Sequence, residues 1–387
     1  SGGKFLYQKA YNKGYLEGIE KVGKVEKVYE KCDFGDLNLS LFFEAYKILK
    51  ENYLDPSRLV PKELIYGAIR GMVESLGDPY TNFLTPEEAK IFKEDVKGEF
   101  EGIGVEIGIK DGKLTIISPL EGTPAQRAGL KAGDVIVKIN DKSTEGMNLD
   151  EAVRLIRGPK GTTVRLTVER RGWSQAKEFE IERARIQIPT IKWEKKEDIL
   201  YLKIYQFLEN TDSIFSDEAK KILRIPTQKM ILDLRNNPGG YFEIAVKIGG
   251  WFIKKGSTIA VEETRDKGKI EYKSQGPAKF EDYKIVVLIN KGTASAAEIL
   301  AAALKENNSS VILIGEETFG KNTVQKLEPL SDNSMIKITI ANWLTPSGKK
   351  ISETGLSPDI KVEAKEEDLE NGKDVQLEKA IEILKKI

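Results

Sequence analysis

The chain contains no histidine and a single cysteine, Cys32, among its 387 residues. Without histidine, no Ser-His or Cys-His pair can form, so a hydrolase built from this chain needs another base. The single cysteine excludes an intrachain disulfide and a cysteine-based zinc cluster, and the lack of histidine removes the commonest metal ligand. We therefore expect no metal and no cofactor.

Net charge and long apolar runs are also lacking. Lysine plus arginine number 61 and aspartate plus glutamate number 61, so no global positive field exists to attract nucleic acid, and we expect no nucleic-acid partner. No apolar run approaches the roughly 18 residues that a membrane span needs. The first residues, Ser1-Gly2-Gly3, are typical of a cloning remnant. We therefore expect that a signal or anchor was trimmed and that the protein is extracytoplasmic, either periplasmic or membrane-attached.

Residues 1–96 carry apolar side chains at helical spacing, as in Leu41 to Leu49 and Leu64 to Val73. Gly77-Asp78-Pro79 interrupts this pattern, and Thr85-Pro86 predicts the start of one more helix. The chain is long enough for two or three domains at roughly 100–200 residues each. We predict a helical N-terminal region, a bundle or docking arm, whose latter part packs on the rest.

Residues 97–185 change to a period of two, which is typical of strands. Asp111-Gly112 favours a tight hairpin turn, and a helix is predicted from Leu149 to Arg157. The pattern indicates a compact β-rich domain. It contains a glycine loop made of Gly102, Ile103, Gly104 and Val105. Backbone N–H groups in such a loop can converge on the terminal carboxylate of a peptide that adds as a strand, although the glycines could also serve only tight turns.

Residues 186–362 alternate apolar strands with helices, which predicts a mixed α/β core around a largely parallel sheet. The remainder, residues 363–387, begins with a mostly charged linker. It ends in a helix over Val375 to Ile387 whose apolar face predicts docking or dimerisation. The sequence as a whole thus indicates a multidomain protein of the α+β and α/β classes.

Ser295 follows a predicted buried strand and precedes a helix that begins at Ala296. At a helix N-terminus, free backbone N–H groups and the positive end of the helix dipole can stabilise an oxyanion beside the hydroxyl. Serine at this position is also a common helix cap. The position of Ser295 alone therefore leaves both interpretations open, a nucleophile and a cap.

Lys321 lies 26 residues after Ser295 (321 − 295), just beyond the next predicted strand. A lysine acts as a general base when burial or a nearby dipole lowers its pKa. Gln325, four residues further on, is placed to hydrogen-bond the lysine amine. The alternative for Lys321 is an ordinary solvated lysine.

Gly315 to Lys321 also fits the G-x-x-x-x-G-K part of a phosphate-binding loop. Such a loop must lead into a helix whose N-terminus holds the phosphate. Asn322 to Pro329 includes β-branched residues and ends in proline, which predicts a strand. We therefore expect no nucleotide site here.

Six motifs, taken in order, resemble those of the carboxyl-terminal processing peptidases, or tail-specific proteases, which are Ser/Lys enzymes with an embedded PDZ domain. The motifs are Leu76 to Glu88, the PDZ signatures at Gly102 to Val105 and Ala128 to Ile136, Leu232 to Gly240, Gly292 to Glu298, Thr318 to Gln325, and Thr345 to Asp359. Thr293 and Ala297 depart from the pattern, because many members carry serines there. Neither departure touches the Ser/Lys pair.

The resemblance implies that Ser295 is the nucleophile, Lys321 the base and Gln325 the residue that orients the base. It further implies that backbone N–H groups of Ala296, Gly239 and Gly240 hold the oxyanion. In this family PDZ domains bind tails and gate the active site. For Arg157, at the end of the PDZ helix, we consider both a link to the protease core and an ordinary surface position.

The expected function is that of a serine endopeptidase that recognises C-terminal tails of protein or peptide substrates through the PDZ domain and cleaves through an acyl-enzyme. We also expect a homodimer or a higher oligomer. The alternative is a non-catalytic adaptor that binds tails through the PDZ domain, with the protease core as its scaffold.

Overall fold

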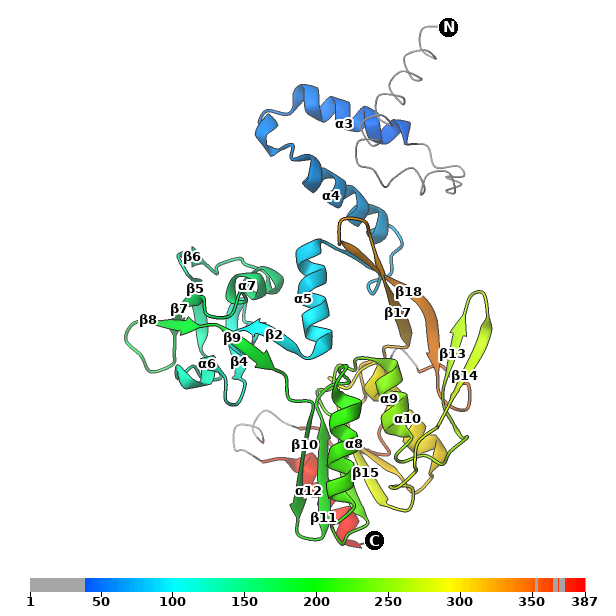
Figure 1. Ribbon diagram of the computed structural model, residues 1–387. Helices are drawn as coiled ribbons and strands as arrows, with labels where there is room; N and C mark the ends of the chain where they lie inside the picture. The colour runs from blue at the N-terminus through cyan, green and yellow to red at the C-terminus, as the bar shows by residue number, and fades with distance from the viewer. Residues whose placement is uncertain (1–38, 352–353, 365–367, 369–372, 387) are drawn as a thin grey trace. The chain divides into compact units, whose positions relative to one another are not determined.

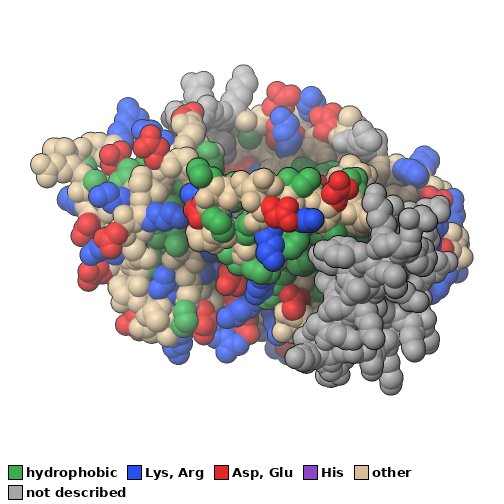
Figure 2. All heavy atoms as spheres, turned by 90° about the horizontal axis from the view of Figure 1, so that it is seen from above, with side chains coloured by type: hydrophobic (Ala, Val, Ile, Leu, Met, Phe, Trp, Pro, Cys, Tyr) green, Lys and Arg blue, Asp and Glu red, His purple; other side chains and the backbone are tan. Residues whose placement is uncertain are grey.

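The computed structural model describes residues 39–351, 354–364, 368 and 373–386, and divides the chain into two units, residues 1–68 and 69–387. The first unit contains α3 (Ser40–Asn52), the short 3-10 helix η1 (Pro56–Arg58) and the start of α4 (Pro61–Glu74). The helical pattern predicted before residue 39, and Cys32 with it, lies outside the described residues. Side chains such as Leu41, Phe42 and Ile48 of α3 are exposed. Figure 2 shows exposed hydrophobic side chains among charged ones on one face of the molecule.

The second unit begins with the rest of α4, followed by β1 (Asn82–Leu84) and α5 (Pro86–Lys97). Thr85 starts α5 with a reciprocal pair of hydrogen bonds: Glu88 N donates to Thr85 Oγ1, and the Glu88 carboxylate accepts from Thr85 N. Two donors at the helix start are thus satisfied, which confirms the predicted start of this helix. None of the described helices combines the length and apolarity needed to cross a membrane.

Residues 99–187 form a β-rich domain with two helices (Figure 1). Its main sheet has the order β3-β4-β5-β7-β8, with β6 beside β5, and β2 pairs separately with β9. The elements are β2 (Glu99–Gly102), β3 (Val105–Lys110), β4 (Lys113–Pro119), α6 (Pro124–Arg127), β5 (Val135–Ile139), β6 (Lys142–Ser143), α7 (Leu149–Ile156), β7 (Thr163–Glu169), β8 (Lys177–Glu182) and β9 (Ala184–Gln187). The predicted hairpin at Asp111-Gly112 joins β3 to β4. Ile116, Ile136 and Leu166 are fully buried at its centre.

A six-stranded sheet forms the core of the second unit. Its strands, in spatial order, are β10 (Ile191–Lys196), β11 (Ile199–Ile204), β12 (Lys229–Asp233), β15 (Lys284–Ile289), β16 (Ile312–Gly315) and β19 (Ile360–Lys361). All neighbouring pairs are parallel except β10 with β11. The predicted largely parallel sheet is therefore confirmed.

Helices cover both faces of this sheet (Figure 1). Leu200 and Leu202 belong to a buried cluster with side chains of α8 (Thr211–Ile222), α9 (Phe242–Gly249) and α10 (Ala296–Asn307). Ile199 and Tyr201, on the opposite face of the same strand, pack with α12 (Val375–Lys386). Because both faces are buried, the strands are apolar at nearly every position, as parallel strands usually are.

A second, antiparallel sheet was not predicted from the sequence. It has the order β1-β18-β13-β14, with β17 also paired to β18. The added strands are β13 (Thr258–Thr264), β14 (Gly268–Lys273), β17 (Thr323–Pro329) and β18 (Met335–Leu344). β18 pairs with β1 and with β17, so it joins the motif around Asp78 to the segment that follows Lys321.

The terminal helix α12 docks on the sheet of its own chain. Ala380 and Leu384 are buried against that sheet. Arg235, just after β12, donates two hydrogen bonds to the Asp233 carboxylate and two to Asp374, immediately before α12. Charge-assisted paired bonds of this type fix orientation as well as position. α12 therefore holds the segment that leads from β12 toward Gly239.

We predict that Leu384→Ala lowers the stability of the folded chain by about 2–5 kcal/mol, because it leaves a cavity between α12 and the central sheet. Urea unfolding followed by tryptophan fluorescence measures this loss. The matched control is Glu378→Ala, an exposed position on the same helix. Equal unfolding midpoints for the two variants would show that α12 does not contribute to the core.

Candidate active site

Ser295 lies between β15 and α10 and is the N-cap residue of α10. Its backbone has φ 53° and ψ −120°. Positive φ is uncommon for a residue with a side chain and indicates a conformation that the surroundings enforce. The side chain is half-buried. Ser295 thus occupies the N-cap position of α10, and this position leaves a nucleophilic role open.

A glycine turn after β12 packs directly against Ser295. A Cβ atom added to Gly239, which has φ +96°, would lie 2.8 Å from Ser295 Cβ and 3.0 Å from Ala296 N. A Cβ on Gly240 would lie 2.1 Å from the carbonyl oxygen of Phe207. Only glycine permits these approaches. The structure therefore brings Gly239 to Ser295 and Ala296, and holds the next residue of the turn, Gly240, against Phe207.

The backbone N–H groups of this turn differ in their availability. Gly239 N donates to Asn237 Oδ1 at 2.9 Å, so it is already engaged. Among the residues that the structure describes, Gly240 N and Ala296 N have no hydrogen-bond partner. Of the three predicted oxyanion donors, Gly240 N and Ala296 N are therefore the two that are free to donate to a developing negative charge.

The carboxylate of Glu298 joins the segments that carry Ser295 and Lys321. Its Oε2 accepts from Ser295 N at 2.8 Å and from Lys321 N at 3.0 Å, and its Oε1 accepts from Gly320 N at 2.7 Å. The Thr318 hydroxyl also donates to Oε1, at 2.5 Å. Glu298 is fully buried. Burial raises its pKa, and the four donors oppose that rise by stabilising the ionised form.

Lys321 is partly buried, and its Nζ lies 5.0 Å from the centroid of the Tyr80 ring. This is within the range of a cation–π contact. In the part of the chain that the structure describes, no hydrogen bond joins Lys321 Nζ to Ser295 Oγ. The structure thus holds the two backbones together and leaves the amine on the tyrosine ring.

The charges around Lys321 act in opposite directions. Burial lowers the pKa of its amine, and the nearby charge of Lys337 lowers it further. The Asp78 and Glu298 carboxylates oppose this shift. The net pKa of Lys321 lies below that of an ordinary lysine. A larger neutral fraction at a given pH is what a lysine base requires.

Gln325 lies on β17 and does not point to the Lys321 amine. Its Nε2 donates to Thr323 Oγ1 at 2.8 Å and to Thr339 Oγ1 at 3.3 Å. The structure therefore does not bring Gln325 into contact with the base candidate. β17 itself confirms that a strand follows Gly320-Lys321, so the phosphate-loop context is absent.

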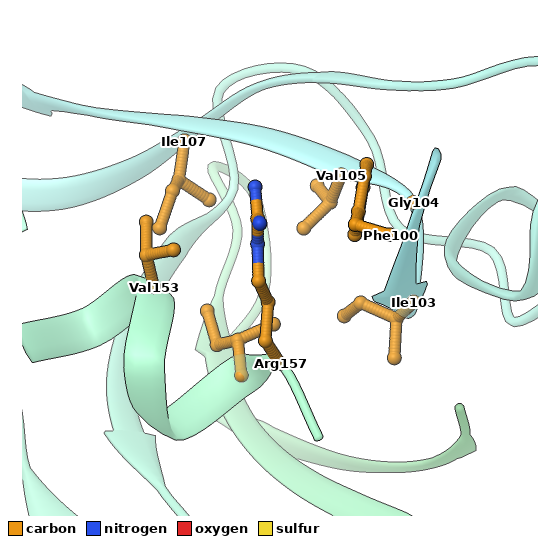
Figure 3. Close-up of a pocket in the computed structure, with 8 residues that line it drawn as sticks. Phe100, Ile103, Gly104, Val105, Ile107, Val153 and Arg157 are labelled. Atoms are coloured by element: carbon orange, nitrogen blue, oxygen red, sulfur yellow. The ribbon is translucent and has the colours of Figure 1, made fainter. Parts of the chain in front are cut away.

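The β-rich domain has a groove between β3 and α7 (Figure 3). Its lining residues are Phe100, Ile103, Gly104, Val105, Ile107, Val153, Ile156 and Arg157. The predicted loop thus contributes Ile103, Gly104 and Val105, and Gly102 ends the adjoining strand β2. The Ile103 carbonyl accepts from Ala125 N, and the Gly104 carbonyl accepts from Leu120 N.

Arg157 extends into this groove (Figure 3). Its guanidinium lies 4.3 Å from the centroid of the Phe100 ring, and Nη2 pairs with Asp95 of α5. Its Nη1 is buried without a hydrogen-bond partner. Arg157 is therefore mostly buried and linked to α5, and it is not an ordinary surface arginine.

Three side chains near the candidate dyad were missed by sequence reasoning: Glu298, Tyr80 and Lys337. Glu298 resembles any acidic residue in the first turn of a helix. Tyr80 is distant from Lys321 in the chain and approaches it through the pairing of β1 with β18, whereas Lys337 lies on β18, the strand that pairs with β17 just after Lys321. The local feature that could have pointed to Glu298 is the glycine before Lys321, whose backbone N–H donates to the Glu298 carboxylate.

Family models match three parts of the chain: peptidase family S41 over residues 198–362, a PDZ domain over 115–170, and the N-terminal domain of the activating protease CtpB over 1–88. The carboxy-terminal processing protease CtpA of Bacillus subtilis is 42% identical over 330 residues, which cover 85% of this chain and 70% of that protein. A CtpA-like serine protease of Staphylococcus aureus strain MRSA252 is 38% identical, over 84% of this chain and 65% of that protein.

A solved structure, that of the photosystem II D1 C-terminal processing protease, superposes with a TM-score of 0.56 at 27% identity and covers 84% of this chain and 92% of that chain. An S41 protease from Bacteroides fragilis has the same fold, with a TM-score of 0.54 at 17% identity over 80% of this chain and 87% of that chain. Together with the sequence relatives, these structures define the class of the protein as a serine-type peptidase with a PDZ domain. The chain belongs to peptidase family S41, among the carboxy-terminal processing proteases.

We predict that Glu298→Gln lowers kcat at least about 100-fold. The NH2 group of glutamine cannot accept hydrogen bonds, so it would face backbone N–H donors that in the wild type bond to a carboxylate oxygen. The unpaired donors should also lower stability by about 1–3 kcal/mol. Steady-state cleavage of an unfolded protein and thermal unfolding measure the two effects. Glu281→Gln, at an exposed position, is the control. Wild-type activity of Glu298→Gln would contradict this role.

Proposed function

We propose that this chain is an endopeptidase in which Ser295 is the nucleophile and Lys321 is the general base. The observation that carries the proposal is the buried Glu298 carboxylate, which accepts from both Ser295 N and Lys321 N. A buried carboxylate is costly unless it is fully hydrogen-bonded, so a contact of this kind fixes both backbones. With no histidine in the chain, the partly buried lysine supplies the base.

The reaction proceeds in two halves. Ser295 Oγ attacks the peptide carbonyl carbon while Lys321 Nζ takes the hydroxyl proton, and Ala296 N and Gly240 N donate to the oxyanion. The C–N bond then breaks as Lys321 returns the proton to the leaving amine, which leaves an ester on Ser295. Water, deprotonated by the same amine, hydrolyses that ester and restores the free serine.

We further propose that the groove between β3 and α7 binds the C-terminal tail of a protein substrate. The carbonyl oxygens of Ile103 and Gly104 accept hydrogen bonds from within the domain. The backbone N–H groups of the loop are the donors for a terminal carboxylate. Apolar side chains of Ile107, Val153 and Ile156 line the groove and suit an apolar terminal residue.

Arg157 is the proposed link between this groove and the protease core. It lines the groove, and it also pairs with Asp95 on α5, the helix between the first motif and the β-rich domain. A tail that enters the groove must share space with this guanidinium, so binding affects the pairing with α5. The extracytoplasmic location, the homo-oligomer and an orienting role for Gln325 stay predictions.

Substitution of the dyad tests the catalytic proposal. We expect Ser295→Ala to abolish cleavage of an unfolded substrate, and Lys321→Ala to lower kcat/KM at least about 1,000-fold, because each removes a group that acts in the transition state. Ser309→Ala and Lys326→Ala, both exposed, are the matched controls. Cleavage that survives either dyad substitution would sink the mechanism. An inactive wild type that still binds tails would favour the adaptor.

Tail recognition is tested by binding to the Ser295→Ala variant, which keeps the peptide intact. We expect a peptide with a free C-terminal carboxylate and an apolar last residue to bind at least about tenfold more tightly than its C-terminal amide, because the amide removes the charge that the loop donors bind. Fluorescence anisotropy measures both affinities. Equal affinities for acid and amide would contradict recognition of the terminus.

A further inference from the structure

The motif around Asp78 forms a tight turn that is fixed to β18. Asp78 accepts hydrogen bonds from Tyr80 N at 2.9 Å and from the Thr81 hydroxyl at 2.5 Å. Thr81 Oγ1 in turn accepts from Thr339 N at 3.0 Å, and the side chain of Thr81 is buried. Asn82 pairs with Lys337 across the β1–β18 ladder. The ring of Tyr80 is therefore held by its own backbone at a defined place.

We propose that Tyr80 is a positioning residue for Lys321: its ring holds the ammonium group in a resting position, from which the amine must move to reach Ser295. The inference rests on the proposed role of Lys321 as the base. The supporting geometry is the 5.0 Å distance between Lys321 Nζ and the ring centroid, together with the lack of a hydrogen bond to Ser295 Oγ among the described residues.

Lys337 lies on β18, opposite Asn82 of β1 and Leu327 of β17, and its charge acts on Lys321. It is partly buried, and its Nζ lies 5.7 Å from the centroid of the Phe92 ring. Burial lowers the pKa of Lys337, and Asp78 opposes that shift. A second cation beside a lysine base disfavours its protonated form. Lys337 therefore limits how strongly the tyrosine ring retains the ammonium form of Lys321.

Among the described residues, the groups that act on the charge of Lys321 do so in two directions. Tyr80 on the turn before β1 favours the ammonium form through its ring face, and the carboxylates of Asp78 and of Glu298 on α10 favour it as well. Lys337 on β18 disfavours it. Since a base must be neutral to act, the pKa of Lys321 sets the acid limb of the pH profile of kcat/KM.

The test compares that acid limb in the wild type, Tyr80→Phe, Tyr80→Leu and Lys337→Met. Tyr80→Phe keeps the ring face and should leave the limb unchanged. Tyr80→Leu should move it to lower pH by about half a unit or more, because the contact that favours the charged form is gone. Lys337→Met should move it to higher pH, because a like charge is removed.

The acid limb is expected to move in opposite directions in Tyr80→Leu and Lys337→Met. Loss of structure would not produce opposite shifts, so the two explanations can be distinguished. An unchanged limb in Tyr80→Leu, or equal shifts in the Phe and Leu variants, would overturn the role of Tyr80. If Tyr80→Leu does not fold, Tyr80→Met supplies the same comparison with a flexible side chain. An unchanged acid limb in Lys337→Met, or one moved to lower pH, overturns the role of Lys337.

Activity that survives Lys321→Ala defeats the proposed function instead. Failure of the proposed function can therefore be told from failure of this inference.

Discussion

The candidate active site depends on one buried carboxylate. Glu298 lies in the first turn of α10 and accepts from backbone N–H groups on both sides of the candidate dyad, at Ser295 and at Lys321. The hydroxyl of Thr318 and Gly320 N complete its four donors. A fully buried carboxylate without these donors would cost several kcal/mol. The fold therefore cannot keep Glu298 in place without also fixing the two segments that the chemistry needs.

The same constraint explains how a chain without histidine can position a base. Lys321 is on the segment that leads from β16 to β17. Glu298 fixes its backbone, while its side chain lies against the ring of Tyr80. Tyr80, on the turn before β1, lies beside the amine, and the charge of Lys337 on β18 acts on it. Motion of one side chain thus separates the resting arrangement from the proposed reactive one.

Much of the fold follows from local pattern. The strands of the central sheet are apolar at nearly every position, because α8–α10 and α12 cover its two faces, and this made a parallel sheet predictable. The antiparallel sheet was missed because strands such as β14 alternate charged and apolar residues and lie at its edge. Ser295 and Lys321 were predicted from motifs in the order of the family, and their catalytic roles stay predictions. Glu298 could not be told from an ordinary acidic residue in the first turn of a helix. Tyr80 was missed because its contact with Lys321 depends on pairing between segments far apart in sequence.

The central claim is that Ser295 is a nucleophile activated by Lys321. It is tested most directly by labelling the wild type and Lys321→Met with a serine-directed fluorophosphonate and locating the adduct by peptide mass spectrometry. The account predicts an adduct on Ser295 that forms at least about 100-fold more slowly in the variant, the size of effect typical of a lost general base. An adduct on another serine, or equal rates in the two proteins, would contradict it.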